Sequence, residues 1–193
     1  MRLKFSKHIF IWIFIAVALI LIDQISKNII LTKFYPNESV KVAGEFFRIS
    51  YVQNRGIAFG LFNNRSEGGK DVFLFVTPAA ICILFYIFSS SPVKTLLFKI
   101  SFLFIVSGAF GNYIDRLLYG FVVDFLDFEF WDIIIQPFSI WKIKFAGYEM
   151  FRWPSFNIAD SLISCGVVLL LIHTVFFEKD IERKEEVTVE QGN

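Results

Sequence analysis

Two aspartates, Asp124 and Asp160, are the residues of this chain best suited to acid–base chemistry. Each lies beside a long apolar run, where an ionisable side chain is costly to bury and by default indicates function. Two carboxyl groups held close together share one proton, because like charges at short range do not both ionise easily. The ionised carboxylate then deprotonates a water molecule, while its protonated partner polarises a carbonyl group. This chemistry requires no metal ion and no cofactor. The residues alone also allow a structural interpretation, in which the aspartates cap helices or pair with Arg116.

Four further residues are spaced to support such a pair. Asn157 lies three positions before Asp160, so both share one face of a helix. Asn112 has the same spacing to Asp115, and Arg116 follows directly. Arg116 either pairs with Asp115 or binds an anionic or carbonyl group of a substrate.

Two other polar blocks lie earlier in the chain. Asp23 and Lys27 are four positions apart on a helix, so they either pair with each other or Asp23 holds the backbone of a sheet on the membrane surface. Both alternatives are structural roles. Asn54 lies in the segment between the first two apolar runs, and Gly56 and Gly60 follow it. Glycines allow the backbone to approach a ligand closely, so this segment is a candidate substrate contact.

Other catalytic chemistries have few residues available. The only histidines, His8 and His173, lie in or near the ends of apolar runs away from the polar blocks, which leaves no metal cluster or Ser-His pair. A serine–lysine pair from Ser26 and Lys27 is disfavoured, because neighbours on a helix point about 100° apart.

The elements that position these residues are membrane helices. The chain has 193 residues, of which 55% are hydrophobic, and a mean hydropathy of +0.59, above that of most soluble domains. We expect one integral membrane domain over 1–193. Four apolar runs approach the roughly 20 residues needed for a span, and a charged tail over 178–193 follows them. The runs are about 9–31, 72–88, 96–118 and 156–177.

The number of spans brings the polar blocks together. With four spans, the first and third end on the face where the second and fourth begin. All polar blocks then meet at that face. The basic N-terminal flank of Arg2, Lys4 and Lys7 favours cytoplasmic termini and an extracytoplasmic polar face. Ala16-Val17-Ala18 resembles a signal-peptide cleavage site, but the apolar run continues beyond it, which favours an uncleaved first helix.

The two long loops differ in composition. Residues 35–62 are rich in aromatic and β-branched types, which predicts short strands in a small sheet on the membrane surface. Residues 125–155 are strongly aromatic and form an interfacial loop, which either covers a site or contacts lipid. Within it, 140–145 alternates as a strand with Lys142 and Lys144 on one side. Ala146-Gly147 is expected to turn this strand back as a hairpin.

Together the polar blocks resemble the lipoprotein signal peptidase family, the signal peptidase II enzymes. The resemblance covers about residues 10–177 and rests on five motifs in order. They are Asp23-Gln-x-Ser-Lys27, Asn54-x-Gly56-x-Ala58-Phe59, Gly108-x-x-Gly111-Asn112-x-x-Asp115-Arg116, Val122-Val123-Asp124-Phe125 and Phe156-Asn157-x-Ala159-Asp160-Ser161. The segment between Phe125 and Phe156 is longer than this family leads us to expect.

The resemblance implies an all-α bundle of four transmembrane helices in the bacterial inner membrane. It also implies an extracytoplasmic β-cradle between the first two helices. The implied activity is removal of signal peptides from diacylglyceryl-modified prolipoproteins just before the lipidated cysteine, with inhibition by globomycin. Asp124 and Asp160 carry over as the catalytic pair, and the Val-Val-Asp match favours Asp124 over Asp115. Supporting or substrate-binding roles carry over to the remaining motif residues: Asn54, Gly56, Asn112, Arg116, Asn157, Asp23, Lys27 and Asp115.

Competing functions are less well matched by the sequence. A small transporter or assembly subunit would place ionisable residues through the depth of the membrane, whereas these cluster at the helix ends. A lipid-modifying transferase would need an activated nucleophile or a basic cluster for lipid headgroups, for which Arg116, Lys142 and Lys144 are the candidates. The net charge of +1 gives no indication of a nucleic-acid partner, and a monomer among membrane lipids is expected. Cys82 and Cys165 are predicted to be small buried residues rather than a disulfide.

Overall fold

The computed structural model describes residues 7–56, 68–91, 95–130, 132–141 and 143–178. The chain forms two compact units that interleave along the sequence. The first comprises Met1–Ser26, Arg55–Val122 and Ile158–Asn193, and the second comprises Lys27–Asn54 and Val123–Asn157.

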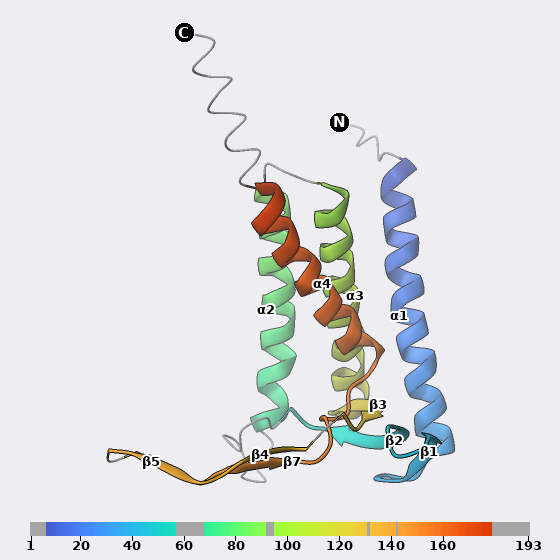
Figure 1. Ribbon diagram of the computed structural model, residues 1–193. Coiled ribbons are helices and arrows are strands. Elements are labelled where there is room, and N and C mark those ends of the chain that lie inside the picture. Colours follow the sequence, from blue (N-terminus) through green and yellow to red (C-terminus); the bar gives the residue numbers. More distant parts are fainter. Residues whose placement is uncertain (1–6, 57–67, 92–94, 131, 142, 179–193) are drawn as a thin grey trace. The chain divides into compact units, whose positions relative to one another are not determined.

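Helices make up the first unit. They are the N-terminal part of α1 (Lys7–Lys33), α2 (Gly68–Ser90), α3 (Leu96–Tyr119) and α4 (Ile158–His173), which continues into the π-helical turn η1 (Thr174–Glu178). Among the described residues, three stretches are long and apolar enough to cross a membrane: Ile9–Lys33, Leu96–Tyr119 and Ile158–Phe176. The apolar part of α2, Leu74–Ser90, is shorter. The mostly helical membrane architecture is thus confirmed (Figure 1), and a fourth span at α2 stays a prediction.

Local signals in the sequence fix both ends of α3. The Thr95 hydroxyl accepts a hydrogen bond from the Phe98 N–H at 3.1 Å, which caps the first turn. At the other end Gly120 adopts a left-handed φ of 74°, and its N–H donates to the Arg116 carbonyl. This cap places Arg116 in the last turn of the helix, and β3 begins at Val122 directly after it.

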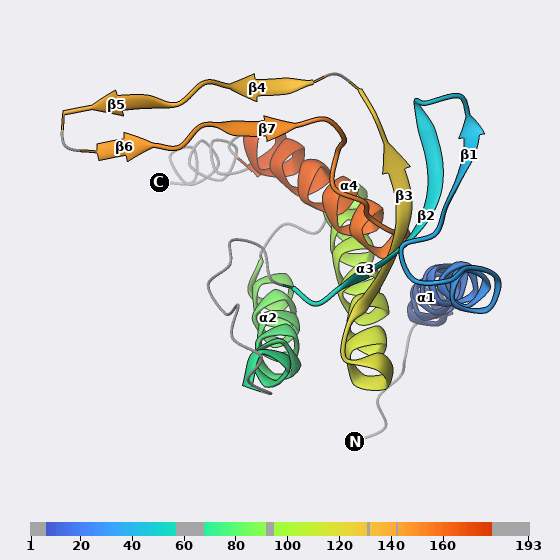
Figure 2. The ribbon, with the colours of Figure 1, turned by 90° about the horizontal axis from the view of Figure 1, so that it is seen from below.

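Glycines bring α3 and α4 into close contact (Figure 2). A Cβ on Gly108 would lie 2.3 Å from the Ala159 carbonyl oxygen, and one on Gly166 would lie 2.9 Å from the Ser101 carbonyl oxygen. Neither space can hold a side chain. Small residues at such positions allow the backbones of membrane helices to approach, which strengthens dispersion contacts and backbone–polar interactions.

The second unit contains the predicted small sheet. Its strand order is β1 (Ser39–Ala43), β2 (Phe47–Asn54) and β3 (Val122–Phe128), and β1 pairs antiparallel with β2. The strands predicted within 35–62 are therefore confirmed as far as residue 56, and residues 57–62 lie outside the described residues. The third strand was not predicted, because it comes from the far side of α3 in the sequence.

A long, narrow ribbon occupies the aromatic loop (Figure 2). It consists of β4 (Ile133–Ile135) paired with β7 (Tyr148–Met150), and β5 (Phe138–Ile140) paired with β6 (Ile143–Phe145). The predicted strand over 140–145 and the predicted hairpin turn at Ala146-Gly147 are both wrong. The chain reverses between β5 and β6, where Trp141 has a positive φ of 54°, and Gly147 instead lies against the Ile135 carbonyl. Lys142 and the Lys144 side chain lie outside the described part of the ribbon.

The base of the ribbon is tied to the sheet by Arg152. Its Nε donates to the Asp127 carboxylate at 2.8 Å, and its Nη1 donates to the Glu129 carboxylate and to the Glu45 carbonyl. The Ser50 hydroxyl donates to the other Asp127 oxygen at 2.8 Å. These bonds join β2, β3 and the segment after β7.

The turn between β1 and β2 carries a small charge cluster. The Glu45 carboxylate accepts hydrogen bonds from Lys41 and Arg48. These bonds, first from Lys41 and then from Arg48, lower the pKa of Glu45 below its usual value. Ionised Glu45 therefore stabilises the turn at any pH above the ordinary pKa of glutamate. This stabilisation is lost as the pH falls through the lowered pKa of Glu45.

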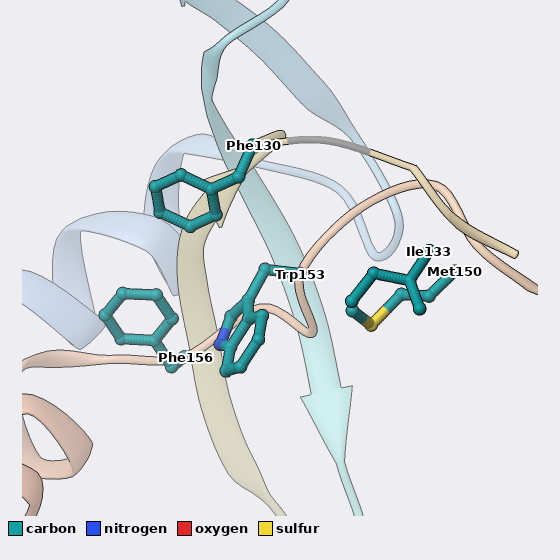
Figure 3. Close-up of a pocket in the computed structure, with 5 residues that line it drawn as sticks. All are labelled: Phe130, Ile133, Met150, Trp153 and Phe156. Atoms are coloured by element: carbon teal, nitrogen blue, oxygen red, sulfur yellow. The ribbon is translucent and has the colours of Figure 1, made fainter.

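Aromatic side chains enclose a pocket in the second unit. Its volume is about 400 Å³, and Figure 3 shows the side chains that line it: Phe130, Ile133, Met150, Trp153 and Phe156. The Phe130 and Trp153 rings meet edge to face, with centroids 6.5 Å apart. All of these side chains are apolar or aromatic, so the pocket offers apolar contacts and no acid–base group.

The prediction for the cysteines is half right. Cys82 and Cys165 are free thiols, as expected, but both are exposed rather than buried. An apolar residue on a membrane helix does not need a protein core, because lipid tails are as apolar as a leucine side chain.

Candidate active site

Asp124 lies in the second unit and is held by two amide side chains. It is 1% exposed, near the start of β3. One carboxylate oxygen accepts from Asn54 Nδ2 at 2.9 Å, and the other accepts from Asn157 Nδ2 at 2.7 Å. Each amide comes from a different segment, the end of β2 and the residue before α4. Two donors on two oxygens suit an ionised carboxylate and fix the plane of the group.

Backbone pairing explains how Asn157 reaches this aspartate. The Phe156 N–H donates to the Leu126 carbonyl at 3.1 Å, and the Phe156 carbonyl accepts from Phe125 and Leu126. Phe156 is thus bridged to β3, and α4 begins only at Ile158, whereas the predicted fourth span begins at about 156. Asn157 is the single residue between the bridged Phe156 and the start of α4, and its side chain is wholly buried.

Asp160 lies in the first unit, in the first turn of α4. Its carboxylate accepts from Asn112 Nδ2 of α3 at 2.7 Å. The first turn of a helix carries the positive end of its dipole, which stabilises a carboxylate there. The sequence grouped Asn112 with Asp115 and Arg116 on one helix, and the structure adds a hydrogen bond from Asn112 to an aspartate on a different helix.

Asp23 supports the start of α4. It is 1% exposed, and its Oδ1 accepts from the Ala159 backbone N–H at 2.9 Å. The N–H groups of a first helical turn have no partner within the helix, so a buried carboxylate both satisfies this group and interacts favourably with the dipole. Asp23 thus holds a backbone group, but this group belongs to α4, next to Asp160, whereas the sequence suggested the backbone of the surface sheet.

Gln24 was not predicted as a site residue, although it belongs to the first motif. Its Nε2 lies 2.9 Å from Asp115 Oδ1, 3.0 Å from the Gly111 carbonyl oxygen and 3.2 Å from Asp23 Oδ2. It therefore links α1 to α3 and separates two buried carboxylates. Asp115, which is 0% exposed, takes part in this internal link. That contact favours a structural role for Asp115.

We expect Gln24→Glu to destabilise the protein more than Gln24→Leu. The leucine variant removes a donor from buried carboxylates and should cost about 1–3 kcal/mol. The glutamate variant adds a third carboxylate beside Asp23 and Asp115, so like-charge repulsion increases the cost. Thermal unfolding in detergent measures both.

Gln53→Glu is the matched control for this pair of variants. Gln53 donates to the Tyr51 hydroxyl at 3.0 Å, a group that can itself donate to a glutamate. The thermal unfolding midpoint of Gln53→Glu should stay near that of the wild type. Equal midpoints for Gln24→Glu and Gln24→Leu would contradict the repulsion argument.

The remaining predicted residues lie in the same elements. Lys27 is 1% exposed on α1, and Arg116 is half-buried in the last turn of α3. Gly56 follows β2 with a φ of 73°, a conformation that favours glycine. The rest of its motif, from Ala58 to Gly60, lies outside the described residues. The Ser26 hydroxyl donates to the Asp23 carbonyl, and His173 packs on the Phe98 ring at 5.0 Å. Within the described residues, no group of three His, Cys, Asp or Glu side chains is arranged to hold a metal ion.

Known proteins resemble this chain over nearly its whole length. The family model described as signal peptidase (SPase) II matches residues 15–176. Lipoprotein signal peptidases from Moorella thermoacetica and Borreliella afzelii are 37% and 38% identical to it. The alignments cover 82% of this chain and 89% of the Moorella protein, and 93% and 97% for the Borreliella protein.

A solved structure supports the same assignment. A bacterial membrane enzyme determined by the in meso method at 2.3 Å resolution is 30% identical, with a TM-score of 0.68, over 95% of this chain and 96% of the other. The fold, the five ordered motifs and the relatives agree. This chain therefore belongs to the signal peptidase II family of lipoprotein signal peptidases, and it is a peptidase of the bacterial inner membrane.

Proposed function

We propose that this protein is an aspartic endopeptidase that cleaves diacylglyceryl-modified prolipoproteins just before the lipidated cysteine, with Asp124 and Asp160 as its catalytic pair. The observation that carries the proposal is the support given to each carboxylate. Asp124 accepts from Asn54 and Asn157, and Asp160 accepts from Asn112. An amide side chain orients a carboxylate and carries no charge of its own. A lysine or arginine side chain would neutralise the carboxylate.

Chain connectivity supports the pairing of the two aspartates. Asn157 donates to Asp124, and Asp160 follows Asn157 by three residues. Three residues span at most about 11 Å even when fully extended, and less in a helical turn. A rotation of the α4 start would change which face Asp160 presents, and the Asn112 and Asp23 contacts oppose such a rotation.

In the proposed reaction the ionised aspartate takes a proton from water, and the resulting hydroxide adds to the scissile carbonyl carbon. The protonated aspartate gives its proton to the carbonyl oxygen. The tetrahedral intermediate then collapses: the C–N bond breaks, the leaving amine takes the proton that the first aspartate removed from water, and the second aspartate regains a proton from a hydroxyl group of the intermediate. The products are the free signal peptide and a lipoprotein with the modified cysteine at its N-terminus. Arg116, Gly56 and the amides hold the substrate, while Asp23, Lys27 and Asp115 support the helices.

The proposal includes the orientation of the protein. Both termini lie in the cytoplasm and the active site lies at the extracytoplasmic face, because the N-terminal flank carries Arg2, Lys4 and Lys7. The lipid anchor of the substrate keeps its scissile bond near that membrane surface. A diacylglyceryl group therefore raises the local concentration of the bond at the site, and a monomeric enzyme suffices for the reaction.

The test uses purified protein in lipid nanodiscs and two forms of one prolipoprotein, with and without the diacylglyceryl group. We expect cleavage of the lipidated form with the modified cysteine as the new N-terminus, identified by mass spectrometry, and inhibition by globomycin. Well-folded protein that leaves the lipidated form intact, while another lipoprotein signal peptidase cleaves the same preparation, contradicts the proposal. Equal cleavage of both forms contradicts the role of the lipid.

A further inference from the structure

The first unit holds a second pocket, which the proposed reaction does not use. It lies between α1, α2 and α3 and has a volume of about 510 Å³. Trp12 and Ala16 of α1 line one side, and Phe88 and Phe102 line the other. Among the described residues that line it, Lys99 is the one with a charge. The pocket lies where α1 and α3 begin and where α2 ends, whereas Asp23 and Asn112 lie in the later turns of their helices (Figure 1).

The pocket lies where α1 is least supported by protein. Among the described residues, the side-chain hydrogen bonds from α1 to other helices lie near its later turns, at Asp23 and Gln24. Towards its start, Phe10 is 62% exposed and Phe14 is 74% exposed. The space beside Trp12 and Ala16 is thus lined by apolar groups on several sides and is not filled by protein. Its volume of about 510 Å³ and its largely apolar lining suit an aliphatic chain.

The charge of the pocket decides between two apolar occupants. Lys99 is half-buried, and among the described residues it makes no ion pair with a carboxylate. Lys7 begins α1, and Arg2 and Lys4 precede it in the sequence. A signal peptide carries its own positive charge at its N-terminal end and would be repelled here. A lipid with a negative headgroup is attracted instead, as at other basic pockets between transmembrane helices.

We propose that this pocket binds one anionic phospholipid of the surrounding bilayer, with an acyl chain between α1 and α3 and the phosphate group paired with Lys99. Trp12 lies near the start of α1, at the depth where tryptophan prefers the lipid–water interface. The bound lipid replaces the missing protein contacts of α1. Binding is independent of the peptidase reaction, so it survives if the proposed function fails.

Native mass spectrometry with phosphatidylglycerol and phosphatidylcholine as probes tests the proposal. We expect one tightly held phosphatidylglycerol on the wild type. Lys99→Gln should weaken that binding about fivefold, the effect of one basic residue near an anionic surface, while leaving phosphatidylcholine binding unchanged. Lys99→Arg should retain the preference. Ala16→Phe fills the pocket and should weaken the binding of both lipids.

Two matched variants control for charge and bulk. Lys33→Gln removes one exposed positive charge at the other end of α1, and Ala18→Phe adds the same ring to α1 outside the pocket. Both should bind phosphatidylglycerol as the wild type does. The proposal is overturned if Lys99→Gln keeps the wild-type preference, or if Ala16→Phe and Ala18→Phe behave alike. Size-exclusion profiles confirm that each variant is folded before lipid is added.

Discussion

Replacing either Asp124 or Asp160 by asparagine is expected to reduce cleavage of the lipidated prolipoprotein by about a hundredfold to ten thousandfold. Each substitution keeps the shape of the side chain and removes a group that takes or gives a proton, and general acid–base catalysis contributes factors of this size. In Asp160→Asn, Asn112 can still donate to the remaining carbonyl oxygen. In Asp124→Asn, one of Asn54 and Asn157 keeps its acceptor, and the other must turn its amide so that its oxygen accepts from the new NH2 group. Single-turnover cleavage assays measure the loss.

The comparison requires a third aspartate that is also buried and not catalytic. Asp127 lies on β3 three residues after Asp124, and it accepts from Ser50 and Arg152. Asp127→Asn should lower the unfolding temperature and keep most of the activity per folded molecule. Loss of activity in Asp160→Asn but not in Asp124→Asn would move the first catalytic position to Asp115. Full activity in both variants would remove the aspartic mechanism.

Gly108→Ala is expected to have the largest effect of any single methyl group added to the helices. The new Cβ would lie 2.3 Å from the Ala159 carbonyl oxygen and 2.8 Å from Ile163 Cγ1. Neither the α4 backbone nor a β-branched side chain can move aside without displacing the helix. Overpacking of this kind costs about 1–3 kcal/mol or more. We therefore expect a lower thermal midpoint.

The same substitution should reduce activity beyond the loss of stability. Ala159 donates its N–H to Asp23 and directly precedes Asp160, so moving α4 away from α3 disturbs both contacts. A misplacement of about 1 Å in a catalytic group is enough to lower kcat by about a hundredfold. Measuring kcat below the unfolding transition separates this effect from unfolding.

Ala80→Val provides the control for Gly108→Ala. It adds more volume at an exposed position of α2, where the surrounding medium can adapt. Its midpoint and kcat should match those of the wild type. A Gly108→Ala protein with the same midpoint and kcat as Ala80→Val would show that α3 and α4 do not approach each other closely at this glycine.

Much of the architecture is predictable because lipid imposes simple rules on a sequence. A spanning helix must be long and apolar, so the positions of α1, α3 and α4 follow from hydropathy alone. An aspartate beside such a run is costly to bury and by default indicates function. The order of polar and apolar residues therefore points to four candidate carboxylates: Asp23, Asp115, Asp124 and Asp160. The ends of α3 are also set locally, by Thr95 and Gly120.

Pairings between distant segments are not predictable in this way. The third strand of the sheet comes from residues after α3, and nothing in 122–128 specifies that β2 is its neighbour. The predicted strand over 140–145 is instead split between β5 and β6 by the turn, because alternating residue types do not show whether the chain continues or reverses. A register in which Ile140 pairs with Ile143 requires the reversal at Trp141, not at Gly147.

The sequence by itself determined which residues are polar at the ends of apolar helices, and therefore the family and the candidate carboxylates. Only the tertiary structure decided which polar group serves which carboxylate: Asn112 bonds to Asp160, Asn157 to Asp124, and Gln24 to Asp115. The physical reason is range. Burial and capping depend on neighbours within a turn or two, whereas a hydrogen bond between helices depends on a packing distance set by residues such as Gly108.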